Sequence, residues 1–296
     1  MDQLSQALVS GLLLGGFYAV MVLGFSVIWG VMGVINLAHG EFLMIGAYMA
    51  WGLFRLFGMD PFASLVLILP LMFLLGYLLQ IVLINRIVER PHLMSLLVTF
   101  GVSIALANLF KILFTSDPRN VAVAYNGSVQ LAGITFPIVK TIIFGAALVI
   151  MAGLHLFLQR TRLGKSIRAA AQNKTAARIV GVDINNVYAI TAGICIALTA
   201  AAGAMLSPTQ AIFPFMGPPF TLKAVTITAL GGLGRIPGAL MGGMILGVTE
   251  IFVATYVEGI GTNLGVATSF VLLVLILVVR PQGLLGGLRP IDAEAE

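Results

Sequence analysis

The chain has 296 residues, of which 59% are hydrophobic and only 9% are charged, and its formal net charge is +5. Water-soluble domains carry about 25% charged residues, so this composition excludes an ordinary soluble protein. Apolar runs of about 20 residues, the helix length that crosses the hydrocarbon core of a bilayer, recur along the chain. The sequence therefore predicts an all-α, polytopic integral membrane protein with a single transmembrane domain over residues 1–296.

Eight segments are apolar over enough residues to form membrane-spanning helices. They cover residues 7–28, 37–56, 62–84, 94–114, 138–158, 186–206, 238–257 and 263–279. The first segment lacks the basic residues that open a signal peptide, so we expect it to be retained as a span. The sole cysteine, Cys195, lies in the sixth segment, which excludes an intrachain disulfide.

A ninth, shorter apolar segment covers residues 221–231. The sequence GGLGRIPG follows it, and the helix-breaking residues before it are Pro208, Pro214, Gly217, Pro218 and Pro219. This pattern predicts a broken or re-entrant helix, which is tolerated only inside a protein interior. Such interruptions often lie near the transport path of membrane transporters.

The distribution of Lys and Arg predicts the orientation, because short cytoplasmic loops are enriched in these residues. The loops that can share the cytoplasmic side contain Arg86 and Arg90, then Arg160, Arg162, Lys165, Arg168, Lys174 and Arg178, then Arg235, and finally Arg280 and Arg289. This holds if the 221–231 segment crosses the membrane, and the N-terminus and the loop 115–137 then face outward. If that segment is re-entrant, one side carries a misplaced charge.

Pairs of glycines four residues apart predict close contacts between helices, since small residues on one face let two backbones approach. These pairs are Gly11 with Gly15, Gly238 with Gly242, Gly243 with Gly247, and Gly261 with Gly265.

The tripeptide Gly164-Lys165-Ser166 raises the question of a nucleotide-binding site. A phosphate-binding P-loop requires G-x-x-x-x-G-K-[ST] between a strand and a helix, so that successive backbone N–H groups surround the phosphates. The first glycine is replaced by Gln159, and the preceding segment is a membrane span. The sequence therefore predicts no nucleotide site in this chain.

The loop that contains this tripeptide instead predicts a short helix over residues 167–180. It is rich in Ala and in straight-chain residues, and it ends at Gly181, a common C-terminal stop. Two interpretations are open at this stage. The helix can lie in a groove on another protein, or the loop can be a solvated, positively charged connection.

Five segments of the sequence carry a resemblance to a known family. They are GGFYAVMVLGFSVIWGVMGVINLAHGEFLMIGAYMA (15–50), LVTFGVSIAL (97–106), LGKSIRAAAQNKTAARIVGVD (163–183), ALGGLGRIPGALMGG (229–243) and RPQGLLG (280–286). The chain resembles the branched-chain amino acid permeases of bacterial ABC importers, specifically the smaller, LivH-like of their two permease subunits. The resemblance covers nearly the full chain.

The resemblance implies that a cytoplasmic coupling loop, residues 160–184, docks on a separate ATPase subunit. The coupling residues it implies are Gly164, Lys165, Arg168, Ala169, Ala170, Asn173, Ala176, Ala177 and Gly181. Relatives commonly carry Arg and Asp where this chain has Lys165 and Asn173, so an acidic contact at position 173 is not expected.

The resemblance also implies the assembly and its location. The partners are a second, LivM-like permease subunit, two ATPase subunits that hold ATP and Mg, and a periplasmic binding protein, with no cofactor in this chain and no nucleic acid. The protein is then a multi-pass protein of the bacterial inner membrane with its C-terminal tail, residues 280–296, in the cytoplasm.

Polar residues within the predicted spans are candidates for the transport path or its gate, because such groups are costly at membrane depth. They are Asn36, His39 and Glu41 in the sequence NLAHGE, Thr226 and Thr228 in the short segment, and Glu250, the most isolated carboxylate. Structural roles are the alternative for the first three, since Asn and Glu in a first helical turn can cap a helix, and His39 can bond a neighbouring helix. Thr99, Ser103 and Asn108 are further polar residues that we do not rank.

Other functions are less consistent with the sequence. His39, His92 and His155 are widely separated, and the spans contain no pair of Asp residues, so we expect no catalytic or metal site. An ion-coupled transporter could use Glu41 and Glu250, but the Ala-rich loop favours a coupled importer. A permease for urea or short amides is the alternative within the same family.

Overall fold

The computed structural model describes residues 2–88, 90–131, 133–232, 234–257, 264–280 and 283–286. The helices are α1 (Asp2–Met32), α2 (His39–Phe57), α3 (Leu65–Val82), α4 (His92–Phe114), α5 (Ile138–Arg160), α6 (Arg162–Gln172), α7 (Lys174–Ile179), α8 (Ile184–Leu206), α9 (Gly217–Gly231), α10 (Ile236–Tyr256) and α11 (Leu264–Val279). A 3-10 turn, Ile84–Arg86, follows α3, and a hairpin of β1 (Ser128–Leu131) and β2 (Ile134–Pro137) lies between α4 and α5. The expected all-α membrane fold is confirmed.

The predicted spans correspond to α1–α5, α8, α10 and α11, and the ninth, short segment corresponds to α9. Among the described helices, six are by themselves long and apolar enough to cross a bilayer, namely α1, α3, α4, α5, α8 and α10. The helices α2, α9 and α11 are shorter or more polar. The start of the last predicted span, Gly261 and most of the predicted tail 280–296 lie outside the described residues.

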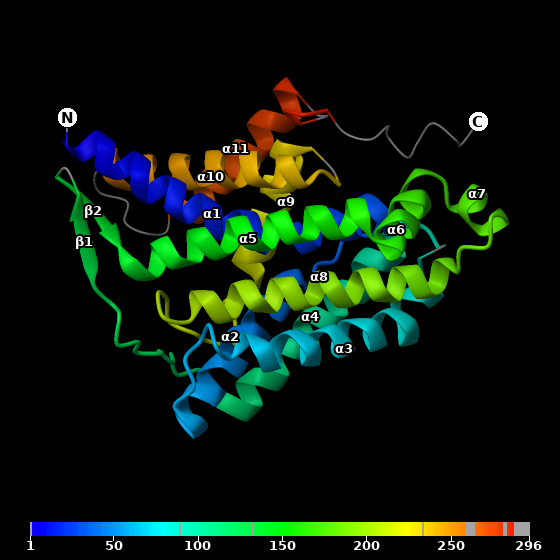
Figure 1. Ribbon diagram of the computed structural model, residues 1–296, viewed down its shortest axis with the longest axis horizontal. Helices are drawn as coiled ribbons and strands as arrows, with labels where there is room; N and C mark the ends of the chain where they lie inside the picture. Colours follow the sequence, from blue (N-terminus) through cyan, green and yellow to red (C-terminus); the bar gives the residue numbers. More distant parts are fainter. Residues whose placement is uncertain are drawn as a thin grey trace.

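The long helices lie side by side, so the molecule has two ends (Figure 1). The β1–β2 hairpin marks the hairpin end, where the Gln6 side chain donates to the Thr135 carbonyl at 2.9 Å and accepts from its N–H at 2.8 Å. Helices α6 and α7 mark the α6–α7 end. The helices α1 and α8 run through the centre of the bundle and are largely buried, whereas α3, α4 and α5 each expose an apolar face.

The chain between α8 and the end of α9 passes from one end of the molecule to the other. Ile212, in the loop before α9, pairs with Arg119 at the hairpin end through two backbone hydrogen bonds of 2.8 Å. At the other end of α9, the Leu230 carbonyl accepts from the N–H of Leu284 at 2.8 Å. Between α8 and the end of α9 the chain thus passes from the hairpin end to the α6–α7 end of the bundle, as the crossing alternative requires. Pro218 and Pro219 lie in the first turn of α9, where a missing N–H costs nothing, rather than ahead of the helix.

One arrangement of helices occurs twice, in opposite directions (Figure 1). After α1 reaches the α6–α7 end, the chain turns back into the bundle, and α2 begins there and runs to the hairpin end. After α8 reaches the hairpin end, the chain again turns back, and α9 begins inside the bundle and runs to the α6–α7 end. Helix α10 packs along α1 as α3 packs along α8. Two half-helices thus start inside the molecule, as in transporters that are built from inverted repeats.

Three of the four predicted glycine pairs make close helix contacts, and the fourth includes Gly261, which lies outside the described residues. A Cβ added at Gly11 would lie 2.6 Å from the Val248 Cα, and one at Gly15 would lie 2.6 Å from the Met244 Cα. From the other side, Gly243 and Gly247 of α10 face the backbone of α1. The two helices cross so closely because neither presents a side chain at the contact.

The predicted single helix over residues 167–180 is wrong in one respect, because the structure has two helices. Asn173 ends α6 and caps α7 in an extended conformation, φ −158° and ψ 104°, and its side chain accepts a 2.9 Å hydrogen bond from the N–H of Ala176. An Asn side chain that satisfies the first N–H groups of a helix favours a new start over continuation. The predicted stop is confirmed at Gly181, which has φ 87°.

Candidate functional site

The first turns of α2 and α9 meet inside the bundle, and we call residues 39–42 and 217–221 the half-helix junction. The Gly40 N–H donates a 2.9 Å hydrogen bond to the hydroxyl of Thr221. A Cβ added at Gly40 would overlap the carbonyl oxygen of Gly217. The two backbones are therefore in direct contact at the point where both half-helices begin.

The structure brings Asn36, His39 and Glu41 to this junction or directly beside it. The side chains of Asn36 and His39 already have hydrogen-bond partners within this chain. The Asn36 side-chain oxygen accepts from the N–H of Ala38 at 3.0 Å, which stabilises the turn before α2. The Nε2 of His39 lies 2.9 Å from the carbonyl oxygen of Met21, and its ring contacts Phe25 at 5.2 Å between centroids. His39 thus bonds a neighbouring helix, the structural alternative considered from the sequence.

Glu41 is the predicted path residue with unused hydrogen-bonding capacity. Its side chain is fully buried, and its Oε1 accepts a 3.0 Å hydrogen bond from the Ser103 hydroxyl of α4. Its Oε2 has no hydrogen-bond partner. A Cβ at Gly217 would lie 2.6 Å from the carboxyl carbon of Glu41, so the carboxyl group rests directly against the start of α9. A carboxyl group at a helix N-terminus is favoured by the helix dipole.

The structure places Glu250 in a second buried polar cluster rather than alone. Lys223 of α9 donates to its Oε1 at 2.8 Å and its Oε2 at 2.9 Å, and the Tyr18 hydroxyl of α1 donates to Oε2 at 2.6 Å. Lys223 also contacts the Tyr18 hydroxyl. Glu250 is isolated along the sequence, but two distant segments supply its partners in the structure. This cluster ties α9 to α1 and α10.

Sequence analysis missed Lys223, although a signal was present. Within the part of the chain that the structure describes, it is the one Lys or Arg that is buried, with 8% of its surface exposed. A single Lys in an apolar segment is a candidate for an intramembrane ion pair when another apolar segment of the chain contains a carboxylate. Ser103, which we left unranked, is the partner of Glu41.

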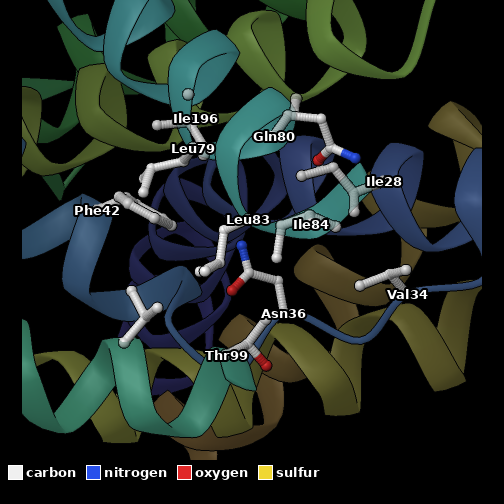
Figure 2. Close-up of a pocket in the computed structure, with 13 residues that line it drawn as sticks. Ile28, Val34, Asn36, Phe42, Leu79, Gln80, Leu83, Ile84, Thr99 and Ile196 are labelled. Atoms are coloured by element: carbon white, nitrogen blue, oxygen red, sulfur yellow. The ribbon is translucent and has the colours of Figure 1, made fainter. Parts of the chain in front are cut away.

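A small pocket lies between α1, α2, α3, α4 and α8, nearer the α6–α7 end (Figure 2). Its lining is mostly aliphatic and aromatic and includes Ile28, Phe42, Leu79, Leu83, Val102 and Ile196. Asn36, Gln80 and Thr99 contribute the polar groups, and Figure 2 shows the Asn36 amide directed toward the centre of the pocket. An apolar pocket with a few polar groups is the usual form of a small-molecule site.

The two predicted threonines of α9 are buried away from the junction. The Thr226 hydroxyl donates to the Leu222 carbonyl at 3.0 Å and lies 3.3 Å from the Ser269 carbonyl of α11. The Thr228 hydroxyl is buried without a partner. Because residues two positions apart point to different faces of a helix, these two do not form one polar site.

The residues of the predicted coupling segment divide between two faces of α6 and α7. The exposed ones are Lys165, Arg168, Asn173, Ala176 and Gly181, Ala169 is half-buried, and the buried ones are Gly164, Ala170 and Ala177. The buried residues face the rest of this chain and contribute to holding the two helices in place. The sequence analysis missed Ile179 and Val180, which are 80% and 76% exposed beside these bases.

Gly164 of the Gly-Lys-Ser tripeptide has a packing role. Its N–H donates a 2.9 Å hydrogen bond to the Thr161 hydroxyl, which caps α6. A Cβ at Gly164 would lie 2.5 Å from the Leu158 Cα, so the close turn between α5 and α6 requires glycine. Within the described ranges, His, Cys, Asp and Glu also do not gather in groups that could hold a metal ion.

Helices that begin inside a bundle, with buried ionisable groups where they meet, are a feature of membrane transport proteins. The family model described as "Branched-chain amino acid transport system / permease component" matches residues 7–279, and the chain belongs to this family. It is 34% identical to the high-affinity branched-chain amino acid transport system permease protein BraD of Pseudomonas aeruginosa, over 95% of both chains. It is 31% identical to the LivH protein of the same description from Escherichia coli, over 95% of both chains. It is 28% identical to a probable branched-chain amino acid transport permease protein LivH of Methanocaldococcus jannaschii, over 90% of this chain and 87% of that one.

Proposed function

We propose that this chain is the LivH-like permease subunit of an ABC importer and forms part of the path for branched-chain or other neutral aliphatic amino acids. The observation that carries the proposal is the family match over residues 7–279 together with relatives of that named function along nearly the whole chain.

ATP is hydrolysed by separate ATPase subunits, and this chain has neither a nucleotide site nor a cofactor of its own. Gly164, which begins the one phosphate-site-like tripeptide, is buried against α5, and its N–H bonds Thr161. Those contacts support a structural use of the tripeptide.

The α6–α7 segment, residues 160–184, docks on an ATPase subunit in the cytoplasm. Its exposed bases and the exposed Ile179 and Val180 offer both charge and apolar surface to a partner. Apolar side chains that are this exposed beside a membrane domain are typical of contact surfaces. The end of the molecule with most of the Lys and Arg then faces the cytoplasm of a bacterial cell, and the hairpin end faces the periplasm and the binding protein.

A second permease subunit, of the LivM type, completes the path. The exposed apolar faces of α3, α4 and α5 leave room for both that subunit and lipid.

Site-directed crosslinking tests the coupling role. Single cysteines at Asn173, Ala176 and Ile179 in a Cys195→Ala background should crosslink to the ATPase subunit in native membranes, and nucleotide should change the yield. Cysteine at the buried Ala177 is the matched control and should not crosslink, because only 3% of that residue is exposed. If the three exposed positions react with a membrane-impermeant thiol reagent from the cytoplasmic side and still form no crosslink, the docking role is wrong.

Uptake by the reconstituted importer tests the substrate. The complete complex with its binding protein should accumulate leucine when ATP is present, and vesicles with this chain alone should neither hydrolyse ATP nor accumulate leucine. Uptake of urea in preference to leucine would contradict the amino-acid proposal. Loss of uptake on addition of a proton ionophore, with ATP still present, would favour ion coupling instead.

A further inference from the structure

We propose that Glu41 is the group in this chain that receives the ammonium of the transported amino acid, when the first turns of α2 and α9 move apart during transport. The inference rests on the proposed function and names one contact within it. Its starting point is a carboxyl group that is fully buried and only half used, since Ser103 bonds Oε1 and nothing bonds Oε2.

A carboxylate can accept about four hydrogen bonds, and the one at Glu41 accepts one. Burying such a group without a cation is costly. The nearby cationic and titratable groups are engaged elsewhere, because Lys223 bonds Glu250 and His39 bonds the Met21 carbonyl of α1. A substrate ammonium, which has three donors and a positive charge, supplies what Oε2 lacks.

The surroundings of Glu41 also explain how a substrate could reach it. On the α9 side the carboxyl group faces Gly217, which has no side chain, and the neighbouring backbone contact is between Gly40 and Gly217. Separation of these two first turns breaks the hydrogen bond between the Gly40 N–H and the Thr221 hydroxyl, and it uncovers the carboxyl group because Gly217 has no side chain to cover it. Movement of one repeat or helix bundle against another around a site in the membrane is a common form of alternating access.

Neither Glu41 nor Ser103 lines the pocket in Figure 2, but the next residue on α2 and the preceding residue on α4 do. Phe42 follows Glu41 on α2, and Val102 precedes Ser103 on α4, and both Phe42 and Val102 line the pocket. An amino acid with an aliphatic side chain presents an ammonium close to an apolar group. Acidic and apolar surfaces on neighbouring residues match that combination.

The test uses the complete importer in proteoliposomes, with Glu41→Gln and Glu41→Asp in this chain. Gln keeps the size of the side chain and its hydrogen bond to Ser103 but removes the charge. Asp keeps the charge on a shorter side chain. Ser26→Ala is the matched control, because it removes another buried polar group without a partner, on α1. The measurements are leucine uptake, ATP hydrolysis stimulated by the loaded binding protein, and the number of ATP molecules used per leucine.

We expect Glu41→Gln to assemble and to hydrolyse ATP like the wild type, while leucine uptake falls by about tenfold, the loss that one charge-assisted hydrogen bond produces. The ATP used per leucine then rises by the same factor, Glu41→Asp keeps part of the uptake, and Ser26→Ala keeps all of it. A purely structural role would lower ATP hydrolysis and uptake together and leave their ratio unchanged.

Wild-type uptake in Glu41→Gln overturns the inference, and so does a parallel loss of assembly, ATP hydrolysis and uptake in both Glu41 variants. These results differ from a failure of the proposed function. In that case the wild-type importer itself takes up no branched-chain amino acid.

Discussion

Removal of the positive charge at Lys223 is the most informative perturbation of the bundle. Lys223→Met keeps a long apolar side chain at a position of α9 that contacts both α1 and α10. It leaves Glu250 with Tyr18 as its remaining partner. The side chains of Lys223 and Glu250 are 10% and 16% exposed, so the pair is largely withdrawn from solvent.

The expected loss follows from that burial. Removal of one member of a buried ion pair costs about 3–5 kcal/mol, because the other charge remains without compensation. Replacement of both charges by apolar groups is often neutral or stabilising, so Lys223→Met with Glu250→Met should recover most of the loss. The Tyr18 hydroxyl would then be unpaired at a cost of about 1–3 kcal/mol, and Tyr18→Phe in addition should remove that cost.

Equilibrium unfolding in mixed micelles measures these free energies, and the four variants of Lys223 and Glu250 form a double-mutant cycle. Lys111→Met is the matched control, since Lys111 is exposed and lies 5.8 Å from the centroid of the Phe215 ring. We expect this control to lose about 1 kcal/mol or less. The reasoning is refuted if Lys223→Met also loses less than about 1 kcal/mol, as for an exposed pair, or if the double variant loses the sum of the two single losses.

Two further predictions concern the ends of the molecule. Gly164→Ala should destabilise the protein by about 1–3 kcal/mol and open the α5–α6 turn, because the new Cβ would lie 2.5 Å from the Leu158 Cα. Faster hydrogen exchange of the α6 backbone would report the opening. The control Gly153→Ala, with nothing within 4 Å of the new Cβ, should be neutral or slightly stabilising, and equal effects of the two substitutions would contradict the packing role. At the hairpin end, burial and the 2.7 Å hydrogen bond to Asp60 raise the pKa of the Tyr125 phenol above its usual value of about 10. As the pH rises, the unfolded chain therefore loses this proton before the folded protein does. The stability advantage of the wild type over Tyr125→Phe should be complete below about pH 10 and shrink above it. Thermal unfolding of both proteins across that pH range measures this, and a difference that does not change with pH would show that the hydrogen bond contributes nothing.

Sequence reasoning located the membrane-spanning helices through properties of short stretches. Apolar length located the spans that became α1, α3 and α8, and glycine spacing located the contact between α1 and α10. It failed where a single residue outweighed a propensity, since the Ala-rich stretch over 167–180 predicted one helix and Asn173 divides it. Sequence alone also could not show that Ala170 and Ala177 are buried, because their burial depends on the helices beneath them.

The candidate site was only partly accessible from sequence. The motif NLAHGE pointed to Glu41 because a carboxylate within an apolar span is conspicuous, but the unused Oε2 and the contact with Gly217 depend on a segment more than 170 residues further along the chain. Likewise, Glu250 was visible as a charge, whereas its pairing with Lys223 and Tyr18 was not, since Tyr18 and Lys223 are 205 positions apart.

The sequence by itself determined that this is a helical membrane protein, where its spans lie and which family it resembles. Hydropathy and residue spacing are sums over neighbouring residues, so they can be evaluated without knowledge of the fold. Only the tertiary structure decided that α9 completes a crossing and meets α2 inside the bundle, and which polar groups are satisfied there. Those outcomes depend on which helix faces come together, and that is determined by the packing of the whole bundle at once.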